Sequence, residues 1–167
     1  PSHGRSERTL HEFLAGQGIP GIAEIDTRRL TRILRDHGAQ SGCIVTDTDD
    51  ADLAVERARA FPGLSGLDLA KDASTTSPYQ WSEPSWGQVA PNADYHVVVM
   101  DYGVKRNILR RLVDVGCRVT VVPATTDVDA VLALQPDGVM LSNGPGDPEP
   151  CDYAIAAARA LMERRIP

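Results

Sequence analysis

The chain has 167 residues, of which 42% are hydrophobic and 24% charged, which suits one ordinary domain or two small ones. Its formal net charge of −6 at pH 7 argues against a general nucleic-acid-binding protein. No stretch approaches the ~18 apolar residues of a membrane span. The polar residues Pro1 to Arg8 also lack the apolar core of a signal peptide. We therefore expect no nucleic-acid partner and no contact with a membrane.

The three cysteines contain no CxxC pair, and their odd number favours reduced thiols in the cytoplasm. The four histidines are scattered, with no HxxxH or CxxH spacing, so we predict no metal site. We expect Cys43 and Cys117 to be buried. Cys151 begins a predicted helix, where a thiol pKa falls, but Glu149 and Asp152 beside it oppose a thiolate. We assign no catalytic residue in this chain, and we expect it to be cytoplasmic.

The first part of the chain, up to about Leu69, is predicted to be mostly helical. Asp26 is a suitable N-cap for a helix that ends at Gly38. The arginines of this helix form either a solvated basic face or a docking face for an acidic partner. Residues 42–46 (GCIVT) are typical of a short strand, and residues 50–61 of an amphipathic helix that ends at a Pro-Gly pair. The apolar stripe of the first helix consists of Leu30, Ile33 and Leu34.

Residues 71–95 are rich in Ser, Thr, Pro and Asn and have no persistent apolar period. We interpret them as a linker or crossover strand between two units. This stretch contains both tryptophans, Trp81 and Trp86. Their rings either pin the crossover to a domain or mark an interface with a partner.

The part after residue 95 alternates strands and helices three times. That pattern predicts a parallel sheet with right-handed crossovers. The final Ile166-Pro167 resembles the start of a further strand, so we expect the chain to stop inside a domain. The predicted strands are residues 97–100, 118–122 and 138–141, and the predicted helices are residues 104–115, 127–134 and 152–164. We expect Asp127 to cap the second of these helices and Asp152 the third.

Ligands of open α/β sheets bind at the carboxyl ends of the strands. Three predicted loops leave that edge, residues 101–105, 123–126 and 142–148. The last loop reads SNGPGDP, and its glycines allow the main chain to approach a ligand closely. Successive N–H groups there form either an anion-binding turn, half of an oxyanion hole, or only a tight connection to the next helix. The loop is neither a P-loop nor a dinucleotide-binding fingerprint.

LSNGPGDPEPCDY (residues 141–153) and MDYGVKRNILRRL (residues 100–112) resemble the small, glutamine-hydrolysing subunit of carbamoyl phosphate synthetase, a class I glutamine amidotransferase. GIAEIDTRRLTRILRDHGAQSGCI (residues 21–44) and ARAFPGLSGLDLA (residues 58–70) are similar to its N-terminal domain. The resemblance covers nearly the whole chain, and the order of the segments is specific to this subunit.

The resemblance implies an α/β fold: the start of a flavodoxin-like parallel sheet, preceded by part of a smaller α+β N-terminal domain. We expect the N-terminal domain at residues 1–72, a linker at 73–95 and the truncated amidotransferase domain at 96–167. The family hydrolyses glutamine with a Cys-His-Glu triad and passes ammonia to a large subunit. That subunit makes carbamoyl phosphate from bicarbonate and ATP, for arginine and pyrimidine synthesis. We expect no cofactor in this chain, and ATP and Mg only on the large subunit.

Carried over by position, Gly144 and Gly146 match the glutamine-binding glycines of the family, and the Gly144 N–H matches an oxyanion donor. Asn143 and Lys105 at the same edge are weaker candidates for a supporting role. The nucleophile and its His and Glu partners belong to segments that are absent here, so we expect the chain alone to be inactive. Two alternatives are another class I amidotransferase and a non-catalytic flavodoxin-like interaction module.

Overall fold

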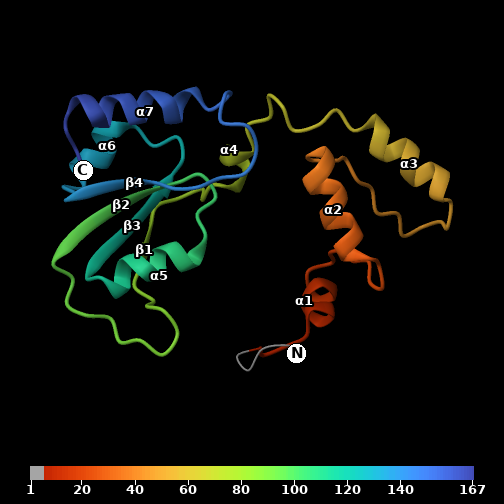
Figure 1. Ribbon diagram of the computed structural model, residues 1–167. Helices are drawn as coiled ribbons and strands as arrows, with labels where there is room; N and C mark the ends of the chain where they lie inside the picture. Colours follow the sequence, from red (N-terminus) through yellow and green to blue (C-terminus); the bar gives the residue numbers. More distant parts are fainter. Residues whose placement is uncertain (1–5) are drawn as a thin grey trace. The chain divides into compact units, whose positions relative to one another are not determined.

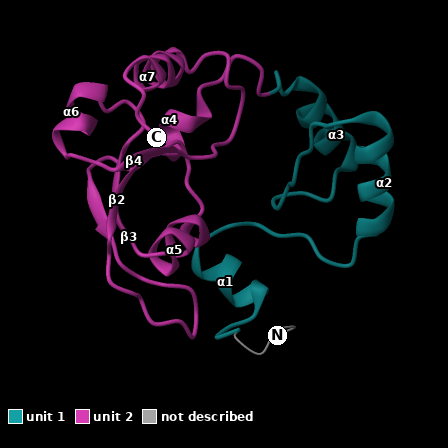
Figure 2. Ribbon diagram, turned by 60° about the vertical axis from the view of Figure 1, so that its left-hand side comes forward, with its two compact units in different colours: residues 1–63 teal, residues 64–167 magenta. Residues whose placement is uncertain are grey.

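The computed structural model describes residues 6–167, so residues 1–5 of the predicted N-terminal domain lie outside the described part. The chain divides into two compact units, Pro1–Gly63 and Leu64–Pro167 (Figure 2). This division falls before residue 72, and the domain boundaries at residues 72 and 95 stay a prediction. Among the described residues, no helix is both long and apolar enough to cross a membrane.

The described part of the first unit consists of three short helices joined by irregular segments. The cap of α2 agrees with the prediction, because the Asp26 carboxylate accepts from the Arg29 N–H at 2.9 Å. Asp50 caps α3 in the same way, by accepting from the Leu53 N–H at 3.1 Å. The apolar stripe of α2 stays 39–45% exposed within the chain. The helices are α1 (Leu10–Gly16), α2 (Thr27–His37) and α3 (Ala51–Ala60).

The strand predicted at residues 42–46 is wrong for this structure, since these residues are irregular. A strand needs a neighbour for its N–H and C=O groups, and residues 6–63 contain no strand that could pair with it. Ile44 is correspondingly 51% exposed. The helix α1, which we did not predict, is stabilised by a capping box in which Thr9 and Glu12 bond reciprocally to each other's backbone N–H.

The second unit contains a four-stranded sheet with the order β1-β3-β2-β4 (Figure 1). Three strands are parallel, as predicted, with Val98 of β2 opposite Thr120 of β3 and Val139 of β4. The short β1 pairs antiparallel with β3 at the outer edge. The chain is therefore α/β, with a mostly parallel sheet. The strands are β1 (Tyr79–Trp81), β2 (Tyr95–Asp101), β3 (Cys117–Pro123) and β4 (Gly138–Leu141).

Helices cover both faces of this sheet, α5 on one side and α6 with α7 on the other (Figure 1). Alternate residues of the buried strands point to opposite faces, so Val98 and Val99 enter different core clusters. Leu109 of α5 is fully buried under one face, and Val131 of α6 under the other. The helices are α4 (Leu69–Ala73), α5 (Arg106–Asp114), α6 (Val128–Ala133) and α7 (Asp152–Glu163).

Two helix starts differ from the sequence prediction. The helix expected from Val104 begins at Arg106, because Asp101 holds residues 103 and 104 in a turn by accepting both of their N–H groups. Asp152 was expected to cap α7, but it is the first helical residue, and Cys151 occupies the cap position without a side-chain hydrogen bond. The predicted cap Asp127 of α6 is confirmed, since it accepts from the Asp129 N–H at 2.7 Å.

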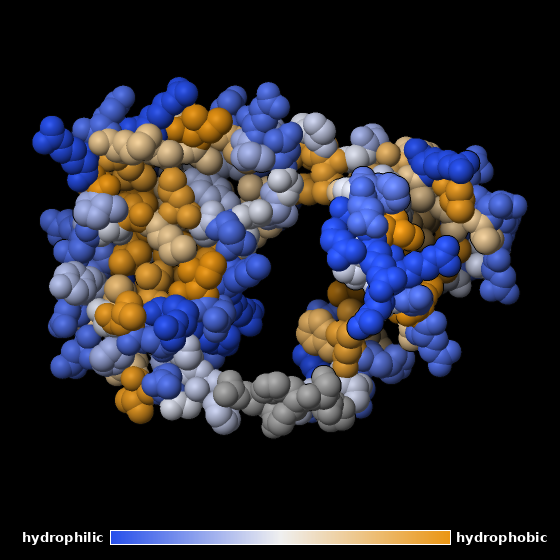
Figure 3. Space-filling view, in the orientation of Figure 1, coloured by the Kyte–Doolittle hydropathy of each residue, from blue (hydrophilic) through white to orange (hydrophobic). Residues whose placement is uncertain are grey.

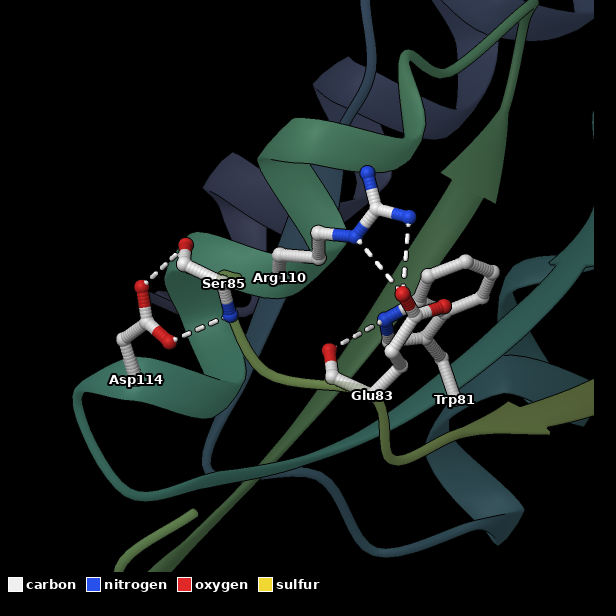
Figure 4. Close-up of polar contacts among 5 residues, drawn as sticks. All are labelled: Trp81, Glu83, Ser85, Arg110 and Asp114. Atoms are coloured by element: carbon white, nitrogen blue, oxygen red, sulfur yellow. Dashed lines mark hydrogen bonds and ion pairs between the residues drawn. The ribbon is translucent and has the colours of Figure 1, made fainter. Parts of the chain in front are cut away.

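The stretch predicted as a linker or crossover, residues 71–95, lies within the second unit, and a group of polar contacts fixes it to α5 (Figure 4). The Arg110 guanidinium donates to Glu83 at 2.8 Å and lies 5.8 Å from the Trp81 ring centroid. Trp81 in turn donates its ring N–H to the Glu83 carbonyl at 2.9 Å. Asp114 accepts from the Ser85 hydroxyl at 2.6 Å and from its N–H at 2.8 Å. Trp81 therefore pins the crossover to the domain, which is one of the two roles we considered.

The strand β4 forms the edge of the sheet opposite β1. Apolar side chains gather there on the front of the molecule (Figure 3). The Val139 N–H donates to the Pro167 carbonyl at 2.8 Å, on the side of β4 away from β2. The chain therefore returns along this edge at its last residue, and the further strand predicted from Ile166-Pro167 stays a prediction.

Candidate functional site

The three loops singled out in the sequence do follow the carboxyl ends of β2, β3 and β4. After β2 the chain enters α5 on one face of the sheet, and after the neighbouring β4 it enters α7 on the opposite face. The connections leave two adjacent strands in opposite directions, which is the switch point where open α/β sheets bind their ligands. The SNGPGDP loop lies at this switch point.

The backbone leaves no room for a side chain at Gly144. A Cβ built there would lie 2.2 Å from the Tyr102 carbonyl oxygen, so the loops after β2 and β4 touch through main-chain atoms. Gly146 has a φ of +82°, a conformation that other residues adopt only with strain. The Gly144 N–H makes no hydrogen bond to any of residues 6–167, and Gly144 is exposed. This amide is therefore available to an anionic ligand.

Ser142 and Asn143 hold the loop against its neighbour. The Ser142 hydroxyl accepts from the Tyr102 N–H at 2.9 Å and donates to the Asn143 carbonyl at 2.8 Å. The Asn143 side chain donates to the Gly103 carbonyl at 3.3 Å. Asn143 thus joins the two loops, while Lys105 is exposed at the N-terminal end of α5.

Asp101 organises the loop after β2 from the last position of the strand. One carboxylate oxygen accepts from the N–H groups of Gly103 and Val104, at 2.9 Å and 2.8 Å. The other accepts from the Thr75 N–H at 2.9 Å. Asp101 is 5% exposed, and these three backbone donors satisfy the buried carboxylate.

A pocket of about 280 Å³ lies at the SNGPGDP loop. This volume is near the small end of the range for ligand sites. Its walls come from the SNGPGDP loop, from α4, from the loop after β2 and from the start of α7. The lining residues are Ala70, Tyr102, Ser142, residues 144–148, Cys151 and Ala154.

Tyr102 and Cys151, which line this pocket, remain protonated at neutral pH. Burial raises the pKa of the Tyr102 hydroxyl to about 12. Burial also raises the pKa of the Cys151 thiol, and the nearby Asp68 carboxylate adds to that effect. A buried thiol with a raised pKa is a poor nucleophile.

The other two cysteines differ from expectation. Cys43 and Cys117 are partly buried rather than buried. Cys43 lies in the irregular stretch where we expected a strand, and Cys117 is the first residue of β3. Within residues 6–167 no group of three or more His, Cys, Asp or Glu side chains could hold a metal ion.

Sequence reasoning missed the contribution of residues 64–75 to this edge of the sheet. Ala70 is a wall of the pocket, and Thr75 bonds to Asp101. The acidic cap of α4, Asp68, was a detectable local signal, since its carboxylate accepts from the Lys71 N–H at 3.1 Å. No local pattern places α4 beside residues that lie some 80 positions later in the chain.

Comparisons with known proteins match both parts of the chain. Residues 98–167 match the family model of class-I glutamine amidotransferases, and residues 1–44 match the model of the carbamoyl-phosphate synthase small chain, CPSase domain. The carbamoyl phosphate synthase small chains of Vibrio cholerae, Pectobacterium atrosepticum and Ralstonia nicotianae are 58%, 57% and 54% identical to it. Each alignment covers 99% of this chain but only 45–46% of the relative. The chain therefore spans about half the length of the curated relatives it matches.

Proposed function

Because the chain belongs to the family of carbamoyl phosphate synthase small chains, we propose that it forms part of a subunit that hydrolyses glutamine and supplies ammonia to a large subunit. The large subunit uses this ammonia to make carbamoyl phosphate for arginine and pyrimidine synthesis, and it binds the ATP and Mg. The subunit acts in the cytoplasm. The nucleophilic Cys and its His and Glu partners lie on segments outside these 167 residues.

One observation carries this proposal: the main chain at Gly144 is exposed and packed so closely that only glycine fits. Hydrolysis of an amide passes through a tetrahedral intermediate with a negatively charged oxygen, and backbone N–H groups held in place stabilise that charge. The Gly144 N–H is such a donor, and its position at the switch point supports this role. Gly146 lets the loop turn close to the bound glutamine.

The Asp147 carboxylate anchors the loop to its surroundings. Asp147 points one carboxylate oxygen at the Gly66 N–H at 3.2 Å and the other at the Glu149 N–H at 3.0 Å. These backbone hydrogen bonds lower the pKa of Asp147, so it is charged at neutral pH. Its two oxygens bond to Gly66 and Glu149 and not to the Gly144 amide.

The test uses the full-length small chain together with its large subunit. We expect glutamine to support carbamoyl phosphate formation, with glutamate released in equal amount, and free ammonia to replace glutamine. Formation of a different amidated product would point to another class I amidotransferase. Partner binding with no glutamine hydrolysis would point to a non-catalytic interaction module, and either result would overturn the proposal.

A further inference from the structure

The segment formed by residues 64–75, which contains α4, contacts all three loops at the carboxyl edge of the sheet. We call it the clasp. Its Thr75 N–H donates at 2.9 Å to Asp101, the last residue of β2, which holds the loop that follows. Its Ser74 hydroxyl accepts from the Ala124 N–H, after β3, at 2.8 Å. Its Gly66 N–H donates to Asp147, after β4, at 3.2 Å.

The clasp also packs directly on the backbone of the SNGPGDP loop. A Cβ at Gly146 would lie 3.1 Å from the Leu69 Cβ and 3.2 Å from the Leu67 carbonyl oxygen. On the neighbouring loop, a Cβ at Gly103 would lie 3.2 Å from the Ala73 Cβ and 3.0 Å from Pro145. The loop that carries Gly144 is therefore held between the clasp and the loop after β2.

Asp68 connects the clasp to the helix that follows the SNGPGDP loop. One of its carboxylate oxygens accepts from the Lys71 N–H at 3.1 Å and from the Tyr153 hydroxyl of α7 at 3.0 Å. Burial disfavours the charged form of Asp68, but these hydrogen bonds outweigh it and lower the pKa. Burial and Asp68 together raise the pKa of Tyr153, so its hydroxyl remains a donor at neutral pH.

We propose that Asp68 is a positioning residue which, through Tyr153 and the clasp, holds the Gly144 amide where the hydrolysis of glutamine requires it. This inference rests on the proposed function. The loop is tied on both sides: Gly66 bonds to Asp147 within it, and Asp68 bonds to Tyr153 just after it. Cys151 makes a further, longer contact with Asp68 at 3.5 Å, and Ser142 and Asn143 hold the loop on its other side. Release of the Asp68–Tyr153 hydrogen bond therefore gives the loop more freedom without unfolding it.

The experiment compares Tyr153→Phe and Asp68→Ala in the full-length small chain assembled with its large subunit. We expect kcat for glutamate release to fall about tenfold in each, since misplacement of a catalytic group by about 1 Å costs up to 100-fold. KM for glutamine should change little, because an oxyanion donor acts mainly in the transition state. The double variant should lose no more than the larger single effect, because both changes remove the same contact.

Two controls separate positioning from stability. Asp127→Ala removes an equivalent N-cap from the short helix α6, whose residues make no hydrogen bond to residues 142–148, so it should lower the melting temperature and leave kcat unchanged. Asp68→Asn keeps a cap and an acceptor for the Tyr153 hydroxyl, so it should restore most of the activity. Deuterium exchange of residues 142–148 should be faster in Tyr153→Phe than in the wild type.

The outcomes distinguish the two proposals. Wild-type protein that releases no glutamate would overturn the proposed function and this inference with it. Normal wild-type turnover, with kcat unchanged in both Tyr153→Phe and Asp68→Ala, would overturn the positioning role alone. A loss of kcat in Asp127→Ala as large as that in Asp68→Ala would also overturn it, since the effect would then follow stability.

Discussion

Replacing Gly144 with alanine adds one methyl group where the backbone has no space for it. The new Cβ would lie 2.2 Å from the Tyr102 carbonyl oxygen and 3.1 Å from its carbonyl carbon. Both neighbours are main-chain atoms, so no side-chain rotation relieves the overlap. Cβ contacts below 3.0 Å essentially never occur, so the two loops must separate by about 0.8 Å.

The magnitude of the effect follows from that displacement. Oxyanion donors act at about 2.7–3.1 Å from the charged oxygen, so a shift of about 0.8 Å moves the Gly144 N–H outside this window. Loss of one such donor costs about 10²–10³ in kcat, or about 2.7–4 kcal/mol. We therefore expect Gly144→Ala in the full-length small chain to retain at most about one hundredth of the wild-type rate of glutamate release.

The assay measures glutamate release at saturating glutamine, together with thermal unfolding to verify the fold. Gly42→Ala is the matched control, because a Cβ at that position meets no atom within 4 Å and the residue has ordinary backbone angles. We expect this control to keep wild-type activity. A Gly144→Ala protein with normal kcat and normal melting temperature would refute the assignment of the loop as an oxyanion site.

The remaining predictions concern other parts of the second unit. Gly146→Ala should reduce glutamate release and Gly87→Ala should not, because both residues have positive φ but only Gly146 packs on a neighbouring segment; equal losses in the two variants would contradict this. Leu109→Ala should destabilise the protein by about 2–5 kcal/mol in urea unfolding, since Leu109 is fully buried, and a cost below about 1 kcal/mol would argue against that packing. Hydrogen bonds from the Ser85 hydroxyl and N–H lower the pKa of Asp114 below its ordinary 3.8. The stability it contributes is therefore present above pH 3.8 and is lost as the pH falls through its lower folded-state pKa. Asp114→Asn should weaken this acid dependence of the urea midpoint, and an unchanged dependence would exclude the contribution.

Local sequence patterns predicted most of the second unit, because its signals are strong and close together. The short apolar run Val97–Met100 is rich in β-branched valine and favours a buried strand, and β2 contains it. Asp127 and Gly138 marked the start of a helix and of a strand where the structure has them. Gly-Pro-Gly after a strand also indicated a close backbone approach, and the structure has that approach at Gly144 and Gly146, while their role as glutamine-binding residues stays a prediction.

Patterns with weak local signals were missed or misread. The run GCIVT at residues 42–46 has the composition of a strand, but strand formation depends on a partner, and residues 6–63 supply none. The three residues of β1 have no distinctive pattern and are ordered by pairing with β3. The Cys151–Asp152 difference at the start of α7 is one position, the usual uncertainty of a helix end.

The sequence by itself determined the alternation of strands and helices, the parallel sheet and the glycines at its carboxyl edge, because each depends on periodicity or on the conformational freedom of single residues. Only the tertiary structure decided how the loop around Gly144 is held. Asp68 and Tyr153 are 85 positions apart and Gly66 and Asp147 are 81 apart. Contacts of this kind arise when the sheet brings distant segments to one edge, and no local period in the chain encodes them.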